Sequence, residues 1–137
     1  MIKLPDVVEI EAFPPGQMRY KTAGDWYYIG NILHVNVVKM EDGRHEFLLA
    51  VHEFVEAMLC RFRVIDQKLV DKWDSEHPDG EGIYPESGDI PGCPYRRDHR
   101  IAMIIEQQLA HELGIDWFAY EEKLDQLLKF QESKSVE

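Results

Sequence analysis

The sequence feature that most restricts the fold is the segment 44–63, in which charged side chains interrupt an otherwise apolar helical pattern. Apolar residues recur at spacings of three and four and cover more than half of the helix circumference, so this helix is expected to be buried on nearly all sides. His52, Glu53 and Glu56 lie in the middle of the pattern. A buried carboxylate without a partner costs on the order of several kcal/mol or takes up a proton. These side chains must therefore either face the solvent or pair with a metal ion or another polar group.

Strands are expected before this helix. β-branched and aromatic residues dominate residues 1–40, and turn residues divide them into short runs. In the run 32–38, Leu33, Val35 and Val37 form one purely apolar face. This alternation is typical of an antiparallel strand that packs one face on helices. The segment that follows the apolar helix either extends it or begins a short new helix.

The C-terminal half is expected to be helical after a long loop. Residues 76–94 are rich in Pro and Gly, and a loop of this length is either a functional flap or disordered. A second long helix is expected from about Tyr95 to Leu113, with Gly114 at its end. Asp116 is expected to cap a last amphipathic helix.

These elements predict one α+β domain over residues 1–137. It consists of a small N-terminal antiparallel sheet within residues 1–40, followed by three main helices, the last two of which lie within residues 95–130. Residues 131–137 are expected to fray. The chain is long enough for a real hydrophobic core.

Composition limits the partners that the protein can have. The net charge is −11, and the densest basic group, Arg96, Arg97 and Arg100, lies beside Asp98, so no nucleic-acid partner is expected. No apolar run approaches the roughly 18–20 residues that cross a bilayer, and the N-terminal residues lack a signal-peptide pattern. The two cysteines occur in different settings and do not form a disulfide framework, which favours a reduced, cytoplasmic protein with no membrane partner.

The spacing of His52 and Glu56 favours a metal site. Residues four apart lie one turn above the other on a single helix face, so this helix can give two ligands to one ion. Glu53 is rotated by about 100° and can reach past the ion to a bound water. In zinc hydrolases with the His-Glu-x-x-His motif, the first and fifth residues bind and the second is the base. Here the fifth residue is Glu, a zinc ligand that leaves the ion a weaker Lewis acid.

The alternative is that the two carboxylates lie on a solvated stripe and that the histidine packs in the core. The second long helix favours the metal, because His99 and Glu106 also lie on its inward, apolar face. They are separated by about 10.5 Å along the helix axis. One is therefore expected to bind the ion, and the other to support the site or to contact a second ion. His99 is the preferred third ligand, and Glu106 is the close alternative.

The order of these elements resembles known families. A strand, a turn and the His-Glu helix over about residues 30–62 resemble the minimal zincin arrangement, in which an edge strand leads into the metal-binding helix. Most of the chain is similar to a family of phage and prophage proteins with an HE-x-x-EA helix, a Pro/Gly loop and a Y-R-x-x-H helix, here Tyr95, Arg96 and His99, ending near LG-[IV]-DW at residues 113–117. That resemblance implies the cytoplasm of a bacterial host and no particular activity.

The leading hypothesis is a zincin-like metalloprotein that binds Zn²⁺ or another divalent metal and hydrolyses peptide or amide bonds. Glu53 would be the catalytic base, and the loop at 76–94 would cover the site. The expected metal ligands are His52, Glu56, His99 and Glu106.

Two alternatives stay open. One is a non-catalytic phage interaction or structural module in which the polar cluster is a buried network. The other is an all-α, Mg²⁺-dependent nucleotide pyrophosphohydrolase with Glu-x-x-Glu helices, against which the strands expected at residues 5–40 argue. The substrate, the metal and the oligomeric state, a homo-oligomer included, are not fixed by the sequence.

Overall fold

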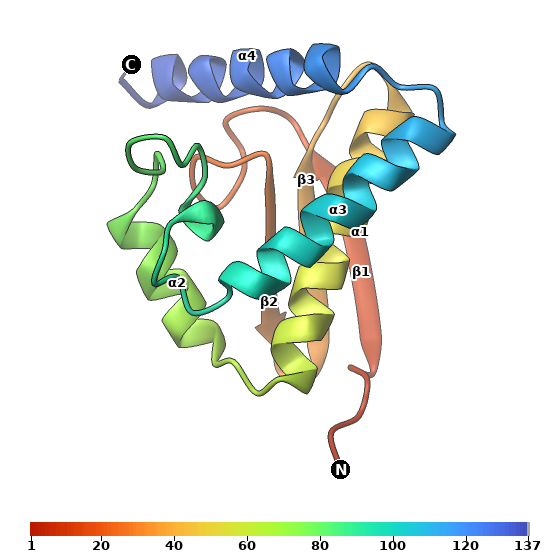
Figure 1. Cartoon of the computed structure of the whole chain (residues 1–137), viewed down its shortest axis with the longest axis vertical. Helices are drawn as coiled ribbons and strands as arrows, with labels where there is room; N and C mark the ends of the chain where they lie inside the picture. The colour runs from red at the N-terminus through yellow and green to blue at the C-terminus, as the bar shows by residue number, and fades with distance from the viewer. Residues whose placement is uncertain (137) are drawn as a thin grey trace.

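A computed structural model describes residues 1–136 as a three-stranded sheet covered by helices (Figure 1). The strands are β1 (Val7–Phe13), β2 (Gly24–Ile29) and β3 (Ile32–Val38). The helices are α1 (Gly43–Phe62), α2 (Gln67–Glu76), the 3-10 helix η1 (Ser87–Asp89), α3 (Arg96–Glu112) and α4 (Trp117–Val136). The expected α+β class is confirmed. The sheet is at odds with the all-α fold on which the pyrophosphohydrolase alternative depends.

The sheet is mixed, with strand order β1-β3-β2. A tight turn at Gly30, which has a φ of 59°, joins β2 to β3 and makes this pair antiparallel. β1 is parallel to β3, so the expectation of an entirely antiparallel sheet is wrong for β1. The physical reason is the path of the chain. After β1 it passes to the far edge of the sheet and forms β2, and β3 then runs back between the two edge strands, in the same direction as β1. The strand that leads into α1 is consequently the central strand, whereas the zincin arrangement has an edge strand there.

The core lies between the inner face of the sheet and helices α1 and α3, which lie side by side in front of it (Figure 1). Leu33, Val35 and Val37 of β3 are almost completely buried, as their alternation predicted. β1 is different, because its large side chains at Val7, Val8 and Ile10 are exposed. The central strand therefore supplies the apolar floor on which α1 rests.

Local hydrogen bonds fix where the helices begin and end. The Asp42 side chain accepts a hydrogen bond from the Arg44 N–H at 2.9 Å and starts α1. Val64 follows the end of α1 at a φ of 58°, and the Asp66 side chain starts α2 by accepting from the Lys68 N–H. The segment after α1 is therefore a new helix and not an extension. Ala119 N–H donates to Asp116 at 3.0 Å, so the expected cap of α4 is confirmed.

Two expectations about helix boundaries and burial need correction. α4 continues as far as Val136, so the segment 131–136, which was expected to be a tail after the last helix, is part of that helix; Glu137 lies outside the described residues. α1 is not buried on all sides, because Phe47 and Phe62 are each about half exposed. One sheet and one neighbouring helix cannot enclose the whole circumference of a helix. Among residues 1–136, no helix has the length and apolar character required to span a bilayer.

The uneven burial of α1 predicts unequal costs for two adjacent truncations. Leu48 is 0% exposed and Phe47 is 47% exposed. Leu48→Ala should lower the free energy of unfolding by about 2–5 kcal/mol, because it removes methyl groups from a packed interior. Phe47→Ala should lower it by less than about 1.5 kcal/mol, since the ring is already half in water. Urea denaturation of both variants measures the difference, and equal losses would contradict the orientation of α1.

Candidate metal centre

Three side chains from α1 and α3 converge on one point in the interior. His52 and Glu56 come from α1 and His99 from α3, and each is at least nine-tenths buried. His52 Nε2 lies 3.3 Å from Glu56 Oε2 and 3.3 Å from His99 Nδ1. His99 Nδ1 lies 3.0 Å from the same Glu56 oxygen. The expected convergence of the two helices is therefore observed.

The size of this triangle matches the face of a zinc coordination tetrahedron. Zinc binds His nitrogen and carboxylate oxygen at about 2.0–2.2 Å, which places neighbouring ligand atoms about 3.3–3.5 Å apart in a tetrahedron. Two of the three observed separations are 3.3 Å and the third is 3.0 Å. These atoms can hold one ion with small adjustments of their side chains.

A carboxylate orients the first of the two imidazoles. Glu106 Oε1 lies 2.7 Å from His52 Nδ1, on the side of the ring away from the triangle. The Tyr120 hydroxyl, at the start of α4, donates to the other Glu106 oxygen at 2.7 Å. A proton on His52 Nδ1 leaves the lone pair of Nε2 free for an ion. Glu106 is thus placed to support His52 and not to join the triangle.

Glu56 is oriented by a tryptophan of the sheet. Trp26 Nε1 in β2 donates to Glu56 Oε1 at 3.0 Å. This bond occupies one carboxylate oxygen and turns the other, Oε2, toward both imidazoles. Glu56 can consequently act as a ligand through one oxygen.

Two carboxylates of the long loop flank the second imidazole. Glu86 Oε2 lies 2.9 Å and Asp89 Oδ1 3.3 Å from His99 Nε2, although neither makes an aligned hydrogen bond with that nitrogen. Their charge favours a proton on Nε2, which leaves the Nδ1 lone pair for the triangle. Glu86, Asp89 and His99 form a second group of potential ligands. We prefer the first group because all three of its members are buried, whereas the Glu86 side chain is 53% exposed.

Two glycines allow these close approaches. A Cβ on Gly88 of η1 would lie 2.5 Å from Cγ of His99, so η1 can reach the imidazole only with glycine at this position. A Cβ on Gly24 would lie 2.6 Å from Oε1 of Glu53, which places the Glu53 side chain against the start of β2. The loop therefore contacts the cluster at His99, and the sheet contacts the neighbouring Glu53.

The protonation equilibria of the cluster are strongly shifted. Burial opposes charge on His52, but the hydrogen bonds to Glu106 and Glu56 outweigh it and raise its pKa well above the usual value. The pKa of His99 is raised in the same way, because Asp89 and Glu56 offset its burial. Burial alone would raise the pKa of Glu56, yet its bonds to the two imidazoles lower that pKa below the usual range. Without an ion, protons on the imidazoles of His52 and His99 bond both rings to the Glu56 carboxylate.

Glu53 does not belong to the triangle but lines the cavity beside it. Burial, followed by the negative charge of Glu56, raises the pKa of Glu53 well above its usual value. No hydrogen bond within the described part of the chain involves the Glu53 carboxylate. It is therefore available to a molecule in the cavity.

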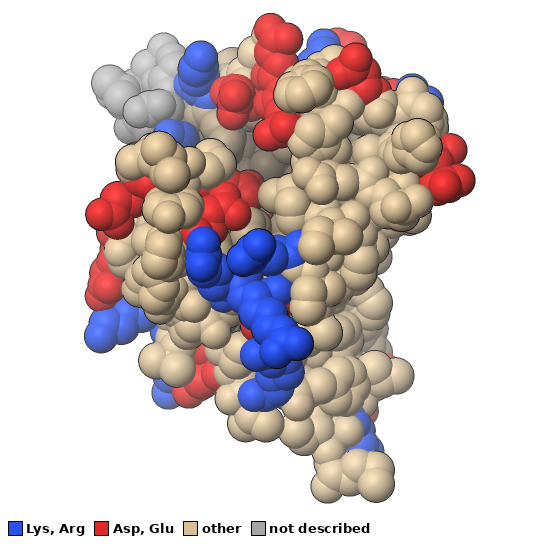
Figure 2. All heavy atoms as spheres, viewed as in Figure 1, with Lys and Arg blue, Asp and Glu red and all other residues tan. Residues whose placement is uncertain are grey.

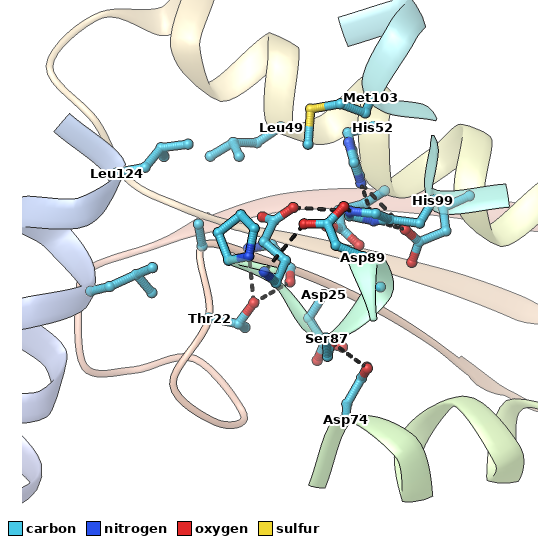
Figure 3. A pocket seen from close by; sticks show the side chains of 18 of the residues that line it. Thr22, Asp25, Leu49, His52, Asp74, Ser87, Asp89, His99, Met103 and Leu124 are labelled. Carbon is cyan, nitrogen blue, oxygen red and sulfur yellow. Dashed lines mark hydrogen bonds and ion pairs between the residues drawn. The ribbon is translucent and has the colours of Figure 1, made fainter. Parts of the chain in front are cut away.

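The cavity beside the triangle has a volume of about 450 Å³. Figure 3 shows His52 and His99 directed toward it, with Asp89 next to His99 and Leu124 of α4 on the far side. The expectation that the Pro/Gly loop covers the site agrees with this arrangement, because Glu86, Ser87 and Gly88 form part of the wall. A volume of this size accommodates a small molecule or a few peptide residues.

The remaining histidines and Cys93 lie elsewhere. His34 stacks on Tyr27 across the β2–β3 pair. His111 is exposed on α3. Cys93 is buried and belongs to neither group of potential ligands among the described residues, and burial raises the pKa of its thiol to about 12.

Four contributors to the site were not identified from the sequence, namely Trp26, Glu86, Asp89 and Tyr120. Glu86 and Asp89 are three residues apart in the loop, and this spacing of two carboxylates was the only local pattern that could have indicated them. Trp26 and Tyr120 looked like ordinary core aromatics. Their polar tips reach carboxylates only after the sheet and α4 have packed.

Comparison of this chain with family models, curated proteins and solved structures gives no match. The interpretation of the site therefore rests on its geometry.

A partly buried carboxyl of α2 holds the loop in place. Asp74 accepts hydrogen bonds from Ser87 Oγ at 2.8 Å and from the Tyr95 hydroxyl, while Trp73 Nε1 donates to the Ser87 carbonyl. Burial raises the pKa of Asp74 to about 6, against the opposing effect of these hydrogen bonds. η1 is thus tied to α2 on one side and to His99 on the other.

This pKa shift predicts a pH-dependent contribution to stability. Because the folded-state pKa of Asp74 lies above its unfolded value, its stabilising protonation is present at low pH and is lost as pH rises through about 6. Asp74→Asn keeps the accepting oxygen and has no such loss. Between pH 5 and pH 8, the variant should gain about 1 kcal/mol of unfolding free energy relative to the original chain. Urea denaturation in chelator measures this, and parallel pH profiles would contradict it.

Proposed function

We propose that the protein binds one Zn²⁺ ion through His52, Glu56 and His99 and uses it to hydrolyse a peptide or amide bond. The observation that carries this proposal is the buried triangle of ligand atoms with the spacing of a zinc site. The outer nitrogens of the two histidines support it. His52 Nδ1 bonds to Glu106, and His99 Nε2 lies beside Glu86 and Asp89. Histidines that bind a metal usually have a carboxylate or carbonyl at their other nitrogen. A ligand set of two imidazoles and one carboxylate suits zinc better than Mg²⁺, which prefers oxygen ligands.

The number of ligands favours catalysis over a structural role. Structural zinc sites usually have four protein ligands, whereas catalytic sites have three and leave one position for water. Here three side chains form the triangle, and a cavity of about 450 Å³ lies beside it. The ion would supply Lewis acidity toward a carbonyl and lower the pKa of a bound water.

Glu53 is the side chain best placed to act as the base. It lines the same cavity, has a raised pKa and keeps its carboxylate free of other hydrogen bonds among the described residues. In the proposed reaction Glu53 accepts a proton from the attacking water, a C–O bond forms at the carbonyl carbon and the C–N bond breaks. The proton held by Glu53 then passes to the leaving amine, so that the base is regenerated.

Metal analysis of two neighbouring variants tests the division of roles. His52→Ala should lose stoichiometric zinc, because it deletes a ligand. Glu53→Gln should keep its zinc, because it deletes only the base, and should reduce hydrolysis by about 100-fold or more. His111→Ala, which removes an exposed histidine from α3, is the matched control and should keep both zinc and activity. Zinc content is measured by atomic emission after dialysis, and hydrolysis with a mixture of fluorogenic peptides.

Equal zinc content in His52→Ala and the original chain would show that the triangle is not the site. A protein that takes up no zinc at all would favour the metal-free interaction module, in which protons alone hold the cluster together. Zinc uptake without hydrolysis of any amide would leave a metal-binding protein and contradict the catalytic role of Glu53.

A further inference from the structure

We infer that the cavity beside the zinc centre accepts a cationic substrate, such as a peptide whose Lys or Arg side chain lies next to the bond to be cleaved. This inference rests on the proposed function and names the substrate class of that site. The observation behind it is the distribution of charge around the cavity, together with the ligand triangle at its base.

Acidic side chains are concentrated in the cavity far beyond their share of the chain. Eleven Asp or Glu residues line it, but only two Lys and no Arg among the described residues. The whole sequence has 26 acidic and 15 basic residues, so an average surface would be much closer to balance. The charge of the cavity is therefore a local property and not a consequence of an acidic protein.

Some of these carboxylates already have partners. Asp25 pairs with Arg19 at 2.8 Å, Asp79 pairs with Lys21 at 3.0 Å, and Glu106 binds His52. With both imidazoles neutral, Zn²⁺ would offset the charges of Glu56 and Glu106. The carboxylates of η1 and α4, namely Glu86, Asp89, Glu121 and Asp125, still leave the cavity negative.

These four acidic groups pair with no Lys or Arg among the described residues and lie on two elements that line the cavity. Glu86 and Asp89 are on the η1 side, beside His99. Glu121 and Asp125 are four residues apart on α4 and also line the cavity. Burial raises the pKa of Glu121, and so do the nearby charges of Glu86 and Asp125. The charges of η1 and α4 therefore lie close enough to act on one another across the cavity.

The main cluster of Lys and Arg side chains on this face lies below the opening (Figure 2). Figure 2 shows Asp and Glu on both sides of the hollow below α4, while the main Lys and Arg cluster lies lower on the same face. A narrow site with one sign of charge focuses its field and attracts ions of the opposite sign. An acidic peptide or a phosphate would be repelled on approach, and a cationic side chain between η1 and α4 would be held.

Isothermal titration calorimetry of the zinc-loaded full chain tests this inference, with capped tetralysine and capped tetraglutamate as probes. Tetralysine should bind at least about tenfold more tightly than tetraglutamate, and the difference should shrink between about 20 mM and about 500 mM NaCl. The double variant Glu121→Gln/Asp125→Asn should weaken tetralysine binding several-fold. Glu122→Gln removes an equal kind of charge from the same helix, outside the cavity lining, and should change binding less than about twofold.

Each outcome decides one claim. Equal binding of the two peptides, or an equal effect of Glu122→Gln and the cavity variants, would overturn the inference. Zinc content is measured on the same samples, so failure to bind zinc overturns the proposed function separately. Zinc binding without a preference for tetralysine would retain the metal centre and reject only its substrate class.

Discussion

The structure depends on one carboxylate oxygen that two imidazoles share. Oε2 of Glu56 lies within 3.3 Å of His52 Nε2 and 3.0 Å of His99 Nδ1, and this contact joins α1 to α3 in the interior. Around it, Trp26 connects the cluster to β2, and Tyr120 connects it through Glu106 to α4. η1 reaches the cluster through the carboxylates beside His99. A buried polar network of this kind fixes which secondary-structure elements pack together, because each polar group needs its partner from another element.

The charge balance explains why such a cluster can be buried. Glu56 and Glu106 carry two negative charges, and burying them alone would be costly. Two protonated imidazoles balance them when no ion is bound, in agreement with the raised pKa values of His52 and His99. One Zn²⁺ with two neutral imidazoles gives the same balance. Zinc binding would therefore exchange protons for an ion at constant local charge, which couples metal binding to pH.

The parts of the site that the sequence predicted are those determined within a single helix. The spacing of His52 and Glu56 on α1, and of His99 and Glu106 on α3, follows from the period of the helix and the apolar residues around them. The helix period does not decide whether His99 or Glu106 lies at the triangle. That choice depends on the position of α3 along the axis of α1, which only tertiary packing determines. The structure places His99 there and Glu106 behind His52.

The features that were missed depend on the packing of separate elements. The parallel pairing of β1 depends on a crossing of the sheet that strand patterns do not encode. The half-exposed Phe47 depends on how many neighbours surround α1, and apolarity alone does not give that number. Glu86 and Asp89 reach His99 because Asp74 and Gly88 bring η1 against it, a contact between distant segments. Periodicity therefore predicted the helices and the inward residues, while tertiary packing determined their partners.

X-ray absorption at the zinc edge of the zinc-loaded protein tests the central claim most directly, because it reports the atoms bound to the ion. The proposed centre predicts about four nitrogen or oxygen neighbours at about 2.0–2.1 Å, with outer scattering from two imidazole rings. The Glu106→Gln variant should keep both imidazoles, since Glu106 lies behind His52 and not at the triangle. A sulfur neighbour at about 2.3 Å, or scattering from fewer than two imidazoles, would contradict a centre formed by His52, Glu56 and His99.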